Sequence, residues 1–288
     1  MRLPTSLRTL RIQLLLVAAT AMPCCGAIGV RTISAGVDPP PLPPSGFSHE
    51  RLDRVLTRHA NSSGVDYQTL AMESGDLRAY AASLAASGPR TTPDRFTSRA
   101  DRLAYYLNAY NALVLLGVVE NWPIESVRDV RAPLAPGGGF GFFYGLRFNL
   151  DGDEINLNDL ENEILRKGFE DARIHAAINC ASVSCPTLQP RAWMPETLEP
   201  DLDRAVAELA GDARHVRIDS ANRVVHLSSI YDWFREDFEK HAERAGKAPT
   251  VLGFIELYGG APVAAAAQSA PGYEIRYMEY DWSINRHK

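Results

Sequence analysis

The longest hydrophobic pattern in the chain is the segment 101–121, DRLAYYLNAYNALVLLGVVEN. In a helix of this sequence, apolar residues would cover almost the whole circumference, and no glycine precedes Gly117. We therefore expect a helix buried at the centre of a domain. Trp122-Pro123 is expected to end it. Asn108 and Asn111 lie three residues apart, on one face of this helix. Because buried amides need hydrogen-bond partners, we expect them to hold neighbouring loops or, alternatively, to contact a substrate.

Shorter apolar segments indicate strands. GLRFNL and DEINL flank Asp151-Gly152, which predicts two strands joined by a tight turn. HVRID and RVVHLS, residues 215–219 and 223–228, predict a second hairpin, and YEIRYM near the end of the chain predicts a last strand. The run ARIHAAINC, residues 172–180, is short, apolar and β-branched at two positions, so we expect a buried strand there.

Helical spacing appears in several further segments, and no βαβ rhythm recurs. Helices are expected over residues 47–60, 76–86, 201–210, 228–244 and 250–259, and residues 260–272 are expected to form a loop. In the segment 228–244 the inner face would carry Ile230, Trp233, Phe234 and Phe238. The sequence therefore predicts an α+β fold: a single globular domain with a central buried helix and a small mixed or antiparallel sheet.

One more helix is expected to begin at Asn156 or Asn158 and to run to Lys167. If Asn158 is the cap, Glu161 completes a capping box and has a structural role. If Asn156 is the cap, Glu161 is free to face a functional site.

The N-terminal segment is typical of a secretory signal. Three arginines precede the apolar stretch 12–22, which is too short to span a bilayer as a helix. We therefore expect a signal peptide over residues 1–27, a stiff Pro-rich linker over 28–46 and a single domain over 47–288. A lipid anchor at Cys24 or Cys25 is disfavoured by Pro23. The expected location is outside the cytoplasm, periplasmic or extracellular.

The net charge of the chain and its motifs limit the kinds of partner that we expect it to bind. Loss of the first thirty residues would remove three arginines and no acids, which changes the net charge from −5 to −8. An acidic chain argues against nucleic acid as a partner, and no other segment is apolar enough to span a membrane. The run Gly137–Gly139 lacks the spacing and the lysine of a phosphate-binding loop. No cofactor is expected. A small molecule or a peptide is the expected partner, as a substrate.

Five stretches, in order along residues 101–285, resemble the family called domain of unknown function 547. They are AYYLNAYNALVLL, INLNDLENEILR, RIHAAINCASVSCPTL, LSSIYDWFREDF and YDWSIN. The resemblance implies the fold and places the site around the cysteine-containing stretch, but it implies no reaction. Within these stretches the chain departs from the usual family pattern at Tyr105-Tyr106, where an aromatic residue and a tryptophan are common. It departs again at Asn162, where a histidine is common.

Cys180 and Cys185 are the chemically distinctive residues of the mature chain. In one hypothesis Cys180 is a nucleophile, His175 is its base, and Glu161 orients the base or binds substrate. Cys185 would then lie beside the substrate, with Asn108 and Asn111. A straight strand opposes this arrangement, since residues 175 and 180 would lie about 16 Å apart on opposite faces. Cys185 as the nucleophile, His226 as the base and Asn179 as the orienting residue are kept as alternatives.

Three functions remain open. The first is an exported cysteine-dependent hydrolase or transferase that acts on an amide or thiol-peptide substrate. The second is a non-catalytic binding or scaffold module with a structural Cys180–Cys185 disulfide, a pairing that the short gap allows. The third is a zinc site with His175, Cys180 and Cys185 as ligands, although their spacing is not that of a typical zinc motif. We expect no metal in the preferred hypothesis.

Overall fold

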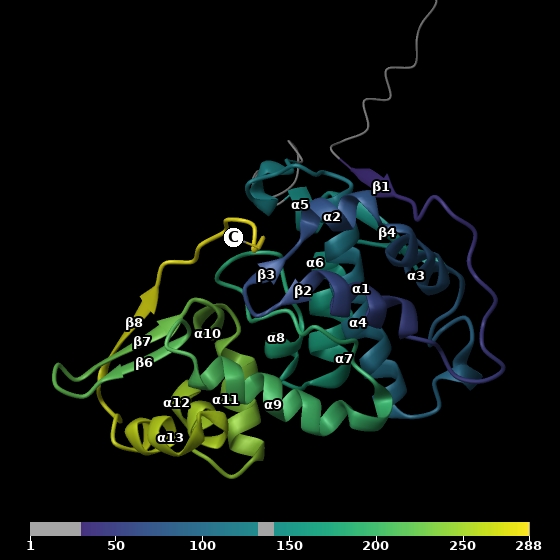
Figure 1. Ribbon diagram of the computed structural model, residues 1–288. Helices are drawn as coiled ribbons and strands as arrows, with labels where there is room; N and C mark the ends of the chain where they lie inside the picture. Colours follow the sequence, from purple (N-terminus) through teal and green to yellow (C-terminus); the bar gives the residue numbers. More distant parts are fainter. Residues whose placement is uncertain (1–29, 132–140, 288) are drawn as a thin grey trace, which may run out of the picture.

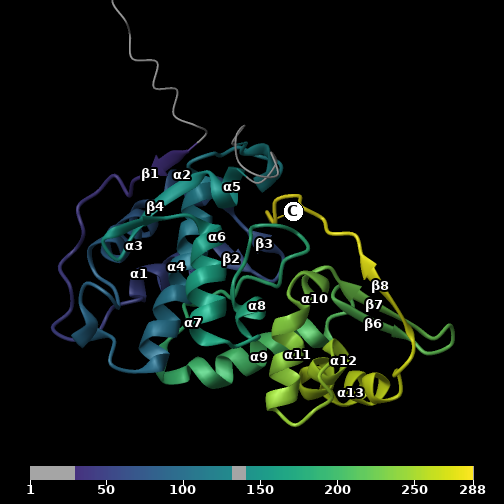
Figure 2. The ribbon, with the colours of Figure 1, turned by 180° about the vertical axis from the view of Figure 1, so that it is seen from behind.

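The computed structural model of the chain describes residues 30–131 and 141–287. The expected signal segment 1–27 and the run Gly137–Gly139 lie outside these residues. Figure 1 shows the earlier elements gathered around a long helix, α4 (Arg99–Val119), and the later helices and a small sheet on the other side. Figure 2 shows the same two regions from behind.

The described residues form a mixture of helices and short strands. The helices are α1 (Glu50–His59), α2 (Tyr67–Met72), α3 (Gly75–Ala86), α4 (Arg99–Val119), α5 (Gly141–Tyr144), α6 (Leu157–Asp159), α7 (Lys167–Phe169), α8 (Ile174–Ala177), α9 (Leu198–Gly211), α10 (Ile230–Trp233), α11 (Arg235–Arg244), α12 (Val251–Tyr258) and α13 (Gly260–Gln268). A π-helix, Leu160–Arg166, joins α6 to α7, and 3-10 turns lie at Pro93–Arg95, Val127–Asp129 and Pro195–Thr197. The strands are β1 (Arg31–Ile33), β2 (Ala60–Asn61), β3 (Gly64–Val65), β4 (Leu146–Leu150), β5 (Asp153–Ile155), β6 (Val216–Asp219), β7 (Val224–Ser228) and β8 (Glu274–Met278).

Helix α4 is the centre of the core, as its apolar sequence predicts. Its residues from Leu103 to Val118 are buried with the exception of Tyr106, and the buried apolar side chains among them belong to the main hydrophobic cluster. Ser98 and Asp101 form a capping box at its N-terminus, which satisfies amide groups that have no partner inside the helix. Helices α2 and α3, strand β4 and the π-helix pack against α4.

Two small mixed sheets confirm the α+β class. Strands β4 and β5 are antiparallel, and so are β6 and β7, which confirms both expected hairpins. Strand β1 pairs in parallel with β4, and β8 pairs in parallel with β7. Strand β1 lies within residues 28–46, the segment expected to be a linker, and its Ile33 is buried in the core.

The expected strand over residues 172–180 is wrong in its first half. Residues Ile174–Ala177 form the short helix α8, and only from Ile178 onward is the backbone extended. The Asp171 side chain accepts a hydrogen bond from the backbone N–H of Arg173 at 3.1 Å, which starts the turn that leads into α8. All four α8 residues are buried, and periodicity cannot separate a short buried helix from a short buried strand.

Two expectations for the C-terminal region are also wrong. The segment 228–244 is not one helix, because Phe234 leaves helical geometry between α10 and α11. Trp233 is consequently 48% exposed and does not belong to an inner face, although Ile230 and Phe238 do. The expected loop over residues 260–272 contains helix α13, which its alanine-rich sequence favours.

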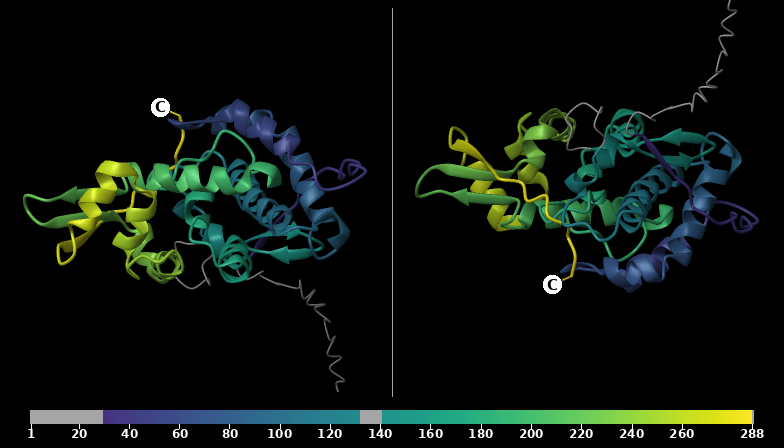
Figure 3. Two further views of the ribbon diagram at one scale, coloured as in Figure 1. Left: turned by 90° about the horizontal axis from the view of Figure 1, so that it is seen from below. Right: turned by 90° about the horizontal axis from the view of Figure 1, so that it is seen from above.

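The chain after β8 returns to the N-terminal half and connects the two regions. Ser283 and Ile284 make β-bridges to Ser126 and Ser182, and Arg286 bridges to Val65 of β3. Figure 3 shows this C-terminal segment running from the outer sheet back toward the blue N-terminal elements. The segment carries Tyr280 and Trp282 to the same place as the Cys180 loop. Within residues 30–131 and 141–287, no helix combines the length and the apolar character that a membrane crossing requires.

Candidate functional site

A cavity of about 470 Å³ opens between the two regions, beside α8 and the loop that follows it. Eight elements contribute to its wall, because α4, α5, α6, the π-helix, α8, the cysteine loop, α10 and the C-terminal segment converge here. The lining residues are Tyr110, Phe143, Tyr144, Asn158, Glu161, Asn162, Arg166, His175, Ile178, Cys180, Cys185, Pro186, Ile230, Trp233, Phe234, Tyr280 and Trp282. All three residues expected to be catalytic, Cys180, His175 and Glu161, therefore lie on one cavity.

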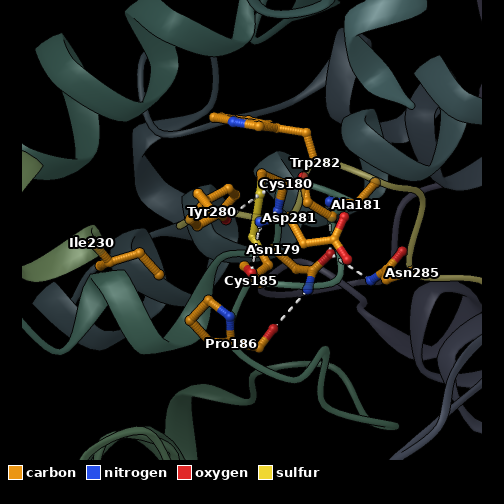
Figure 4. Close-up of a disulfide and its surroundings, with 12 residues drawn as sticks. Asn179, Cys180, Ala181, Cys185, Pro186, Ile230, Tyr280, Asp281, Trp282 and Asn285 are labelled. Carbon is orange, nitrogen blue, oxygen red and sulfur yellow. Dashed lines mark hydrogen bonds between the residues drawn. A yellow bond between two sulfur atoms is a disulfide. The ribbon is translucent and has the colours of Figure 1, made fainter. Parts of the chain in front are cut away.

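The two cysteines form a disulfide in the cavity wall, with Cα atoms 6.2 Å apart (Figure 4). Cys180 is partly exposed, whereas Cys185 is 6% exposed. The backbone N–H of Cys180 donates to Cys185 Sγ at 2.8 Å. The hydroxyls of Tyr280 and Ser182 lie 3.1 and 3.3 Å from Cys180 Sγ and act as donors, because a disulfide sulfur carries no hydrogen. Cys180 is thus the more accessible sulfur of the pair.

The disulfide is expected to stabilise the fold by about 2 kcal/mol, because it closes a short loop in the unfolded chain. Urea unfolding of the oxidised and the reduced protein should show this difference in the free energy of unfolding. The double variant Cys180→Ser/Cys185→Ser is the control, since reductant should not change its transition. Equal midpoints for the oxidised and reduced forms of the natural chain would contradict a stabilising bond.

Asn179 holds the cysteine loop and does not orient a catalytic histidine. Its Nδ2 donates to Pro186 O at 2.7 Å, and its Oδ1 accepts from the backbone N–H of Ala181 at 2.8 Å and from Asn285 Nδ2 at 3.1 Å. Ala181 has a positive φ of 61°, so the backbone turns sharply directly after Cys180. The alternative role of Asn179 as an orienting residue is therefore wrong.

His175 is oriented by Asp237, a residue that the sequence analysis did not single out. Its Nε2 lies 2.8 Å from Asp237 Oδ2, and its ring stacks on Phe234 with centroids 4.0 Å apart. His175 lies on α8 and Asp237 in the first turn of α11, so the packing of these two helices brings together residues 62 positions apart in the chain. Asp237 follows Phe234 by three residues, which in a helix places the two side chains on one face. This spacing is the signal by which the sequence could have identified Asp237 as a residue of the site.

The charges of this pair determine the tautomer of His175. Burial alone would raise the pKa of Asp237, but hydrogen bonds from His175 and Arg166 outweigh it and hold that pKa well below its usual range. Burial lowers the pKa of His175, and Asp237 only partly offsets the effect. A neutral imidazole beside an ionised carboxylate must donate from Nε2, because the carboxylate only accepts. Nδ1 then carries the lone pair and can act as a base.

Arg166 is the second residue that the sequence analysis missed. Its Nε and NH2 donate to the two oxygens of Asp237 at 2.6 and 3.1 Å, and NH1 donates to Asn162 Oδ1 at 2.6 Å. The guanidinium also lies over the Phe234 ring, 4.8 Å from its centroid. Asn162, at the position where the resembled family often has a histidine, therefore positions an arginine here.

Glu161 faces the cavity, as expected if Asn156 caps the helix. Asn156 Oδ1 accepts from the backbone N–H of Asp159 at 2.7 Å, so Asn156 is the cap and a capping-box role for Glu161 is excluded. Tyr110 donates its hydroxyl to Glu161 Oε2 at 3.1 Å. Burial raises the pKa of Glu161 to about 7, although the Tyr110 hydrogen bond and the charge of Arg166 act against it. Since Asp237 orients His175, Glu161 is available to meet a ligand.

Asn108 and Asn111 are structural, and their expected substrate-binding role is corrected. They are 0% and 2% exposed and do not line the cavity. Asn108 exchanges two hydrogen bonds with the backbone of Trp193, at 2.7 and 2.9 Å. Asn111 donates to Ala177 O and accepts from the backbone N–H of Asn179, both at 2.9 Å. These contacts tie α4 to the segments that carry the site.

The remaining alternatives receive no support from the geometry. His226 on β7 does not line the cavity. Both cysteine sulfurs are in the disulfide, and His175 Nε2 is bound to Asp237, so the three-ligand zinc set is not assembled. Across residues 30–131 and 141–287, no cluster of three or more histidine, cysteine or acidic side chains is arranged to hold a metal ion.

Three aromatic side chains, Trp233, Tyr280 and Trp282, form one side of the cavity, which we call the aromatic wall. Their ring centroids lie 4.6 to 5.7 Å apart. Figure 4 shows Tyr280 against the disulfide and Trp282 farther out. Two of the three rings come from the segment after β8, so the wall exists only because the end of the chain folds back.

Comparison with known proteins identifies one family. No curated protein and no solved structure was found to match the chain. A family described as "Protein of unknown function, DUF547" matches residues 93–209. This range contains α4, Glu161, His175 and both cysteines, and it ends before Asp237 and the aromatic wall. From Pro93 to Leu209 the chain therefore matches the family of unknown function DUF547, and this range contains three of the five stretches that carry the resemblance.

Proposed function

We propose that the cavity is the active site of a cysteine-dependent hydrolase or transferase that acts on an amide or thiol-peptide substrate. Cys180 is the nucleophile, His175 is the base, and Asp237 holds the base in the tautomer that leaves Nδ1 unprotonated. The observation that carries the proposal is the His175–Asp237 hydrogen bond of 2.8 Å on the cavity to which Cys180 is exposed. A histidine oriented by a carboxylate and an accessible cysteine on the same cavity are the groups that nucleophilic catalysis requires.

The disulfide makes this activity conditional on reduction. An external dithiol supplies two electrons and two protons, which convert the Cys180–Cys185 bond into two thiols while the dithiol becomes a disulfide. The Cys180 thiol then gives its proton to His175 Nδ1, and the thiolate attacks the carbonyl carbon of the substrate. The leaving amine or thiol takes the proton back, and water or a second nucleophile releases the acyl group from Cys180.

Alkylation of a variant in which Cys180 is unpaired tests the proposal without knowledge of the substrate. In Cys185→Ser the disulfide cannot form, and mass spectrometry of the peptide that contains Cys180 separates its reaction with iodoacetamide from any reaction at Cys24 or Cys25. We expect alkylation to persist below about pH 8, because protonated His175 stabilises the thiolate, whereas an ordinary thiol has a pKa of about 8.5. Adding His175→Gln should restore the pH profile of an ordinary thiol.

Asp237→Asn in the Cys185→Ser background provides the second comparison. The amide cannot fix the tautomer in the same way, so the profile should move toward that of an ordinary thiol. Thermal unfolding shows whether each variant folds. Identical alkylation profiles in the folded His175 variant, the folded Asp237 variant and their parent would contradict the assignment of the base.

The disulfide itself favours a second candidate, a binding or scaffold module in which Cys180–Cys185 is structural. In this case the cavity binds a ligand and no covalent step follows. The module predicts that the oxidised protein is the functional form and that no variant turns over a substrate. We also propose that the protein is exported to the periplasm or the extracellular space, where the disulfide persists until an external dithiol reduces it.

A further inference from the structure

One carboxylate oxygen of Glu161 accepts no hydrogen bond from the residues that the structure describes. The residue is half-buried and lines the cavity. In the part of the chain that the structure describes, Tyr110 is its hydrogen-bond donor, and the bond goes to Oε2. A carboxylate oxygen in such a cavity needs further hydrogen bonds or a positive charge. Oε1 receives no hydrogen bond from the described residues, and the charge of Arg166 only partly offsets the effect of burial on the pKa of Glu161.

The other ionisable groups of the cavity do not neutralise Glu161. Arg166 is held by both oxygens of Asp237, which is ionised, and His175 is neutral because burial lowers its pKa. Burial raises the pKa values of Tyr110 and Tyr280, so both hydroxyls stay protonated. The cavity therefore carries about one uncompensated negative charge once Glu161 loses its proton.

The aromatic wall adds a second feature that favours a positive ligand. Tyr280 is close enough to Glu161 for the carboxylate to raise the pKa of its hydroxyl, in addition to the larger effect of burial. Aromatic faces attract ammonium and guanidinium groups, and they also cover the apolar part of a ligand. A carboxylate and aromatic rings thus meet in one cavity of about 470 Å³.

We propose that this cavity binds an organic cation, with an ammonium or guanidinium group at Glu161 and an apolar chain against the aromatic wall. The inference deepens the proposed function and rests on it for one step, the identification of this cation as part of the amide substrate. The cation binds to the oxidised protein, since neither Glu161 nor the aromatic wall needs a free thiol.

Calorimetric titration of the oxidised natural chain with 2-phenylethylammonium tests the proposal. The neutral analogue 2-phenylethanol has the same apolar part without the charge. At about pH 8 the ammonium should bind at least about 10-fold more tightly, because most Glu161 carboxyls are then ionised. At about pH 6 the preference should fall, since Glu161 is protonated below its pKa of about 7.

Two matched variants locate the binding group. Glu161→Gln keeps a side chain that can accept from Tyr110 but removes the charge, so the preference for the ammonium should disappear. Glu163→Gln is the control, because Glu163 lies two residues away, pairs with Lys167 and does not line the cavity. Trp233→Leu should weaken binding of both compounds, because it removes part of the aromatic wall.

The outcomes separate this inference from the proposed function. Equal affinity for the ammonium and the alcohol, no binding of the ammonium, or an unchanged preference in folded Glu161→Gln would each overturn it. Because these measurements use the oxidised protein, binding can be found even where the alkylation experiment shows that Cys180 is an ordinary thiol. Failure of the cation site would likewise leave the alkylation result unaffected.

Discussion

Cys185→Ser is expected to turn over amide or thioester substrates without added reductant, whereas Cys180→Ser is expected to be at least about 10³-fold slower under all conditions. The two substitutions abolish the same disulfide and differ only in which thiol remains. Cys180 is partly exposed to the cavity and Cys185 is buried, so we expect Cys180 and not Cys185 to act as the nucleophile. The natural chain should become active only after its disulfide is reduced.

A panel of chromogenic amides and thioesters, some with a cationic group, provides the measurement. Each variant is assayed with and without dithiothreitol, and thermal unfolding confirms that both are folded to the same extent. Equal rates in the two single-cysteine variants would rule out Cys180 as the nucleophile. If no form of the protein is active and the oxidised chain still binds its ligand, the binding module is the better description.

Asn111→Ala is expected to lower the free energy of unfolding by about 2–4 kcal/mol. The substitution leaves the buried backbone N–H of Asn179 without its acceptor and removes one of the two donors to Ala177 O. An unsatisfied buried donor costs about 1–3 kcal/mol, and lost packing in a fully buried helix adds to this. Asn111 also joins α4 to both ends of the segment between α8 and Cys180, so local order around the site should decrease.

The matched control is Asn121→Ala. Asn121 lies after the end of the same helix, is partly exposed, and donates to Gly117 O at 2.7 Å. Its loss should cost less than about 1 kcal/mol, because water can replace the exposed contact. Chemical denaturation of both variants measures the difference, and hydrogen exchange at the Asn179 amide locates it. A cost for Asn111→Ala no larger than that for Asn121→Ala would show that the buried amide does not hold this loop.

The elements predicted correctly are those whose pattern depends on neighbours in the chain. Helix α4 was predicted because apolar residues on all sides of a helix need burial from every direction. The two hairpins were predicted because alternation and a tight-turn sequence are local features. Helix α8 was missed, and so was the break at Phe234, since a short buried segment satisfies either periodicity and tertiary packing selects between them.

The sequence by itself singled out Cys180, His175 and Glu161, and the structure places these three residues on one cavity. Only the tertiary structure decided their partners. Asp237 orients His175, Arg166 pairs with Asp237, and the aromatic wall comes largely from the last residues of the chain. The physical reason is the separation of the partners along the chain. Hydrophobic periodicity indicates which face of an element is buried, whereas a contact between residues 62 or 100 positions apart depends on how whole elements pack.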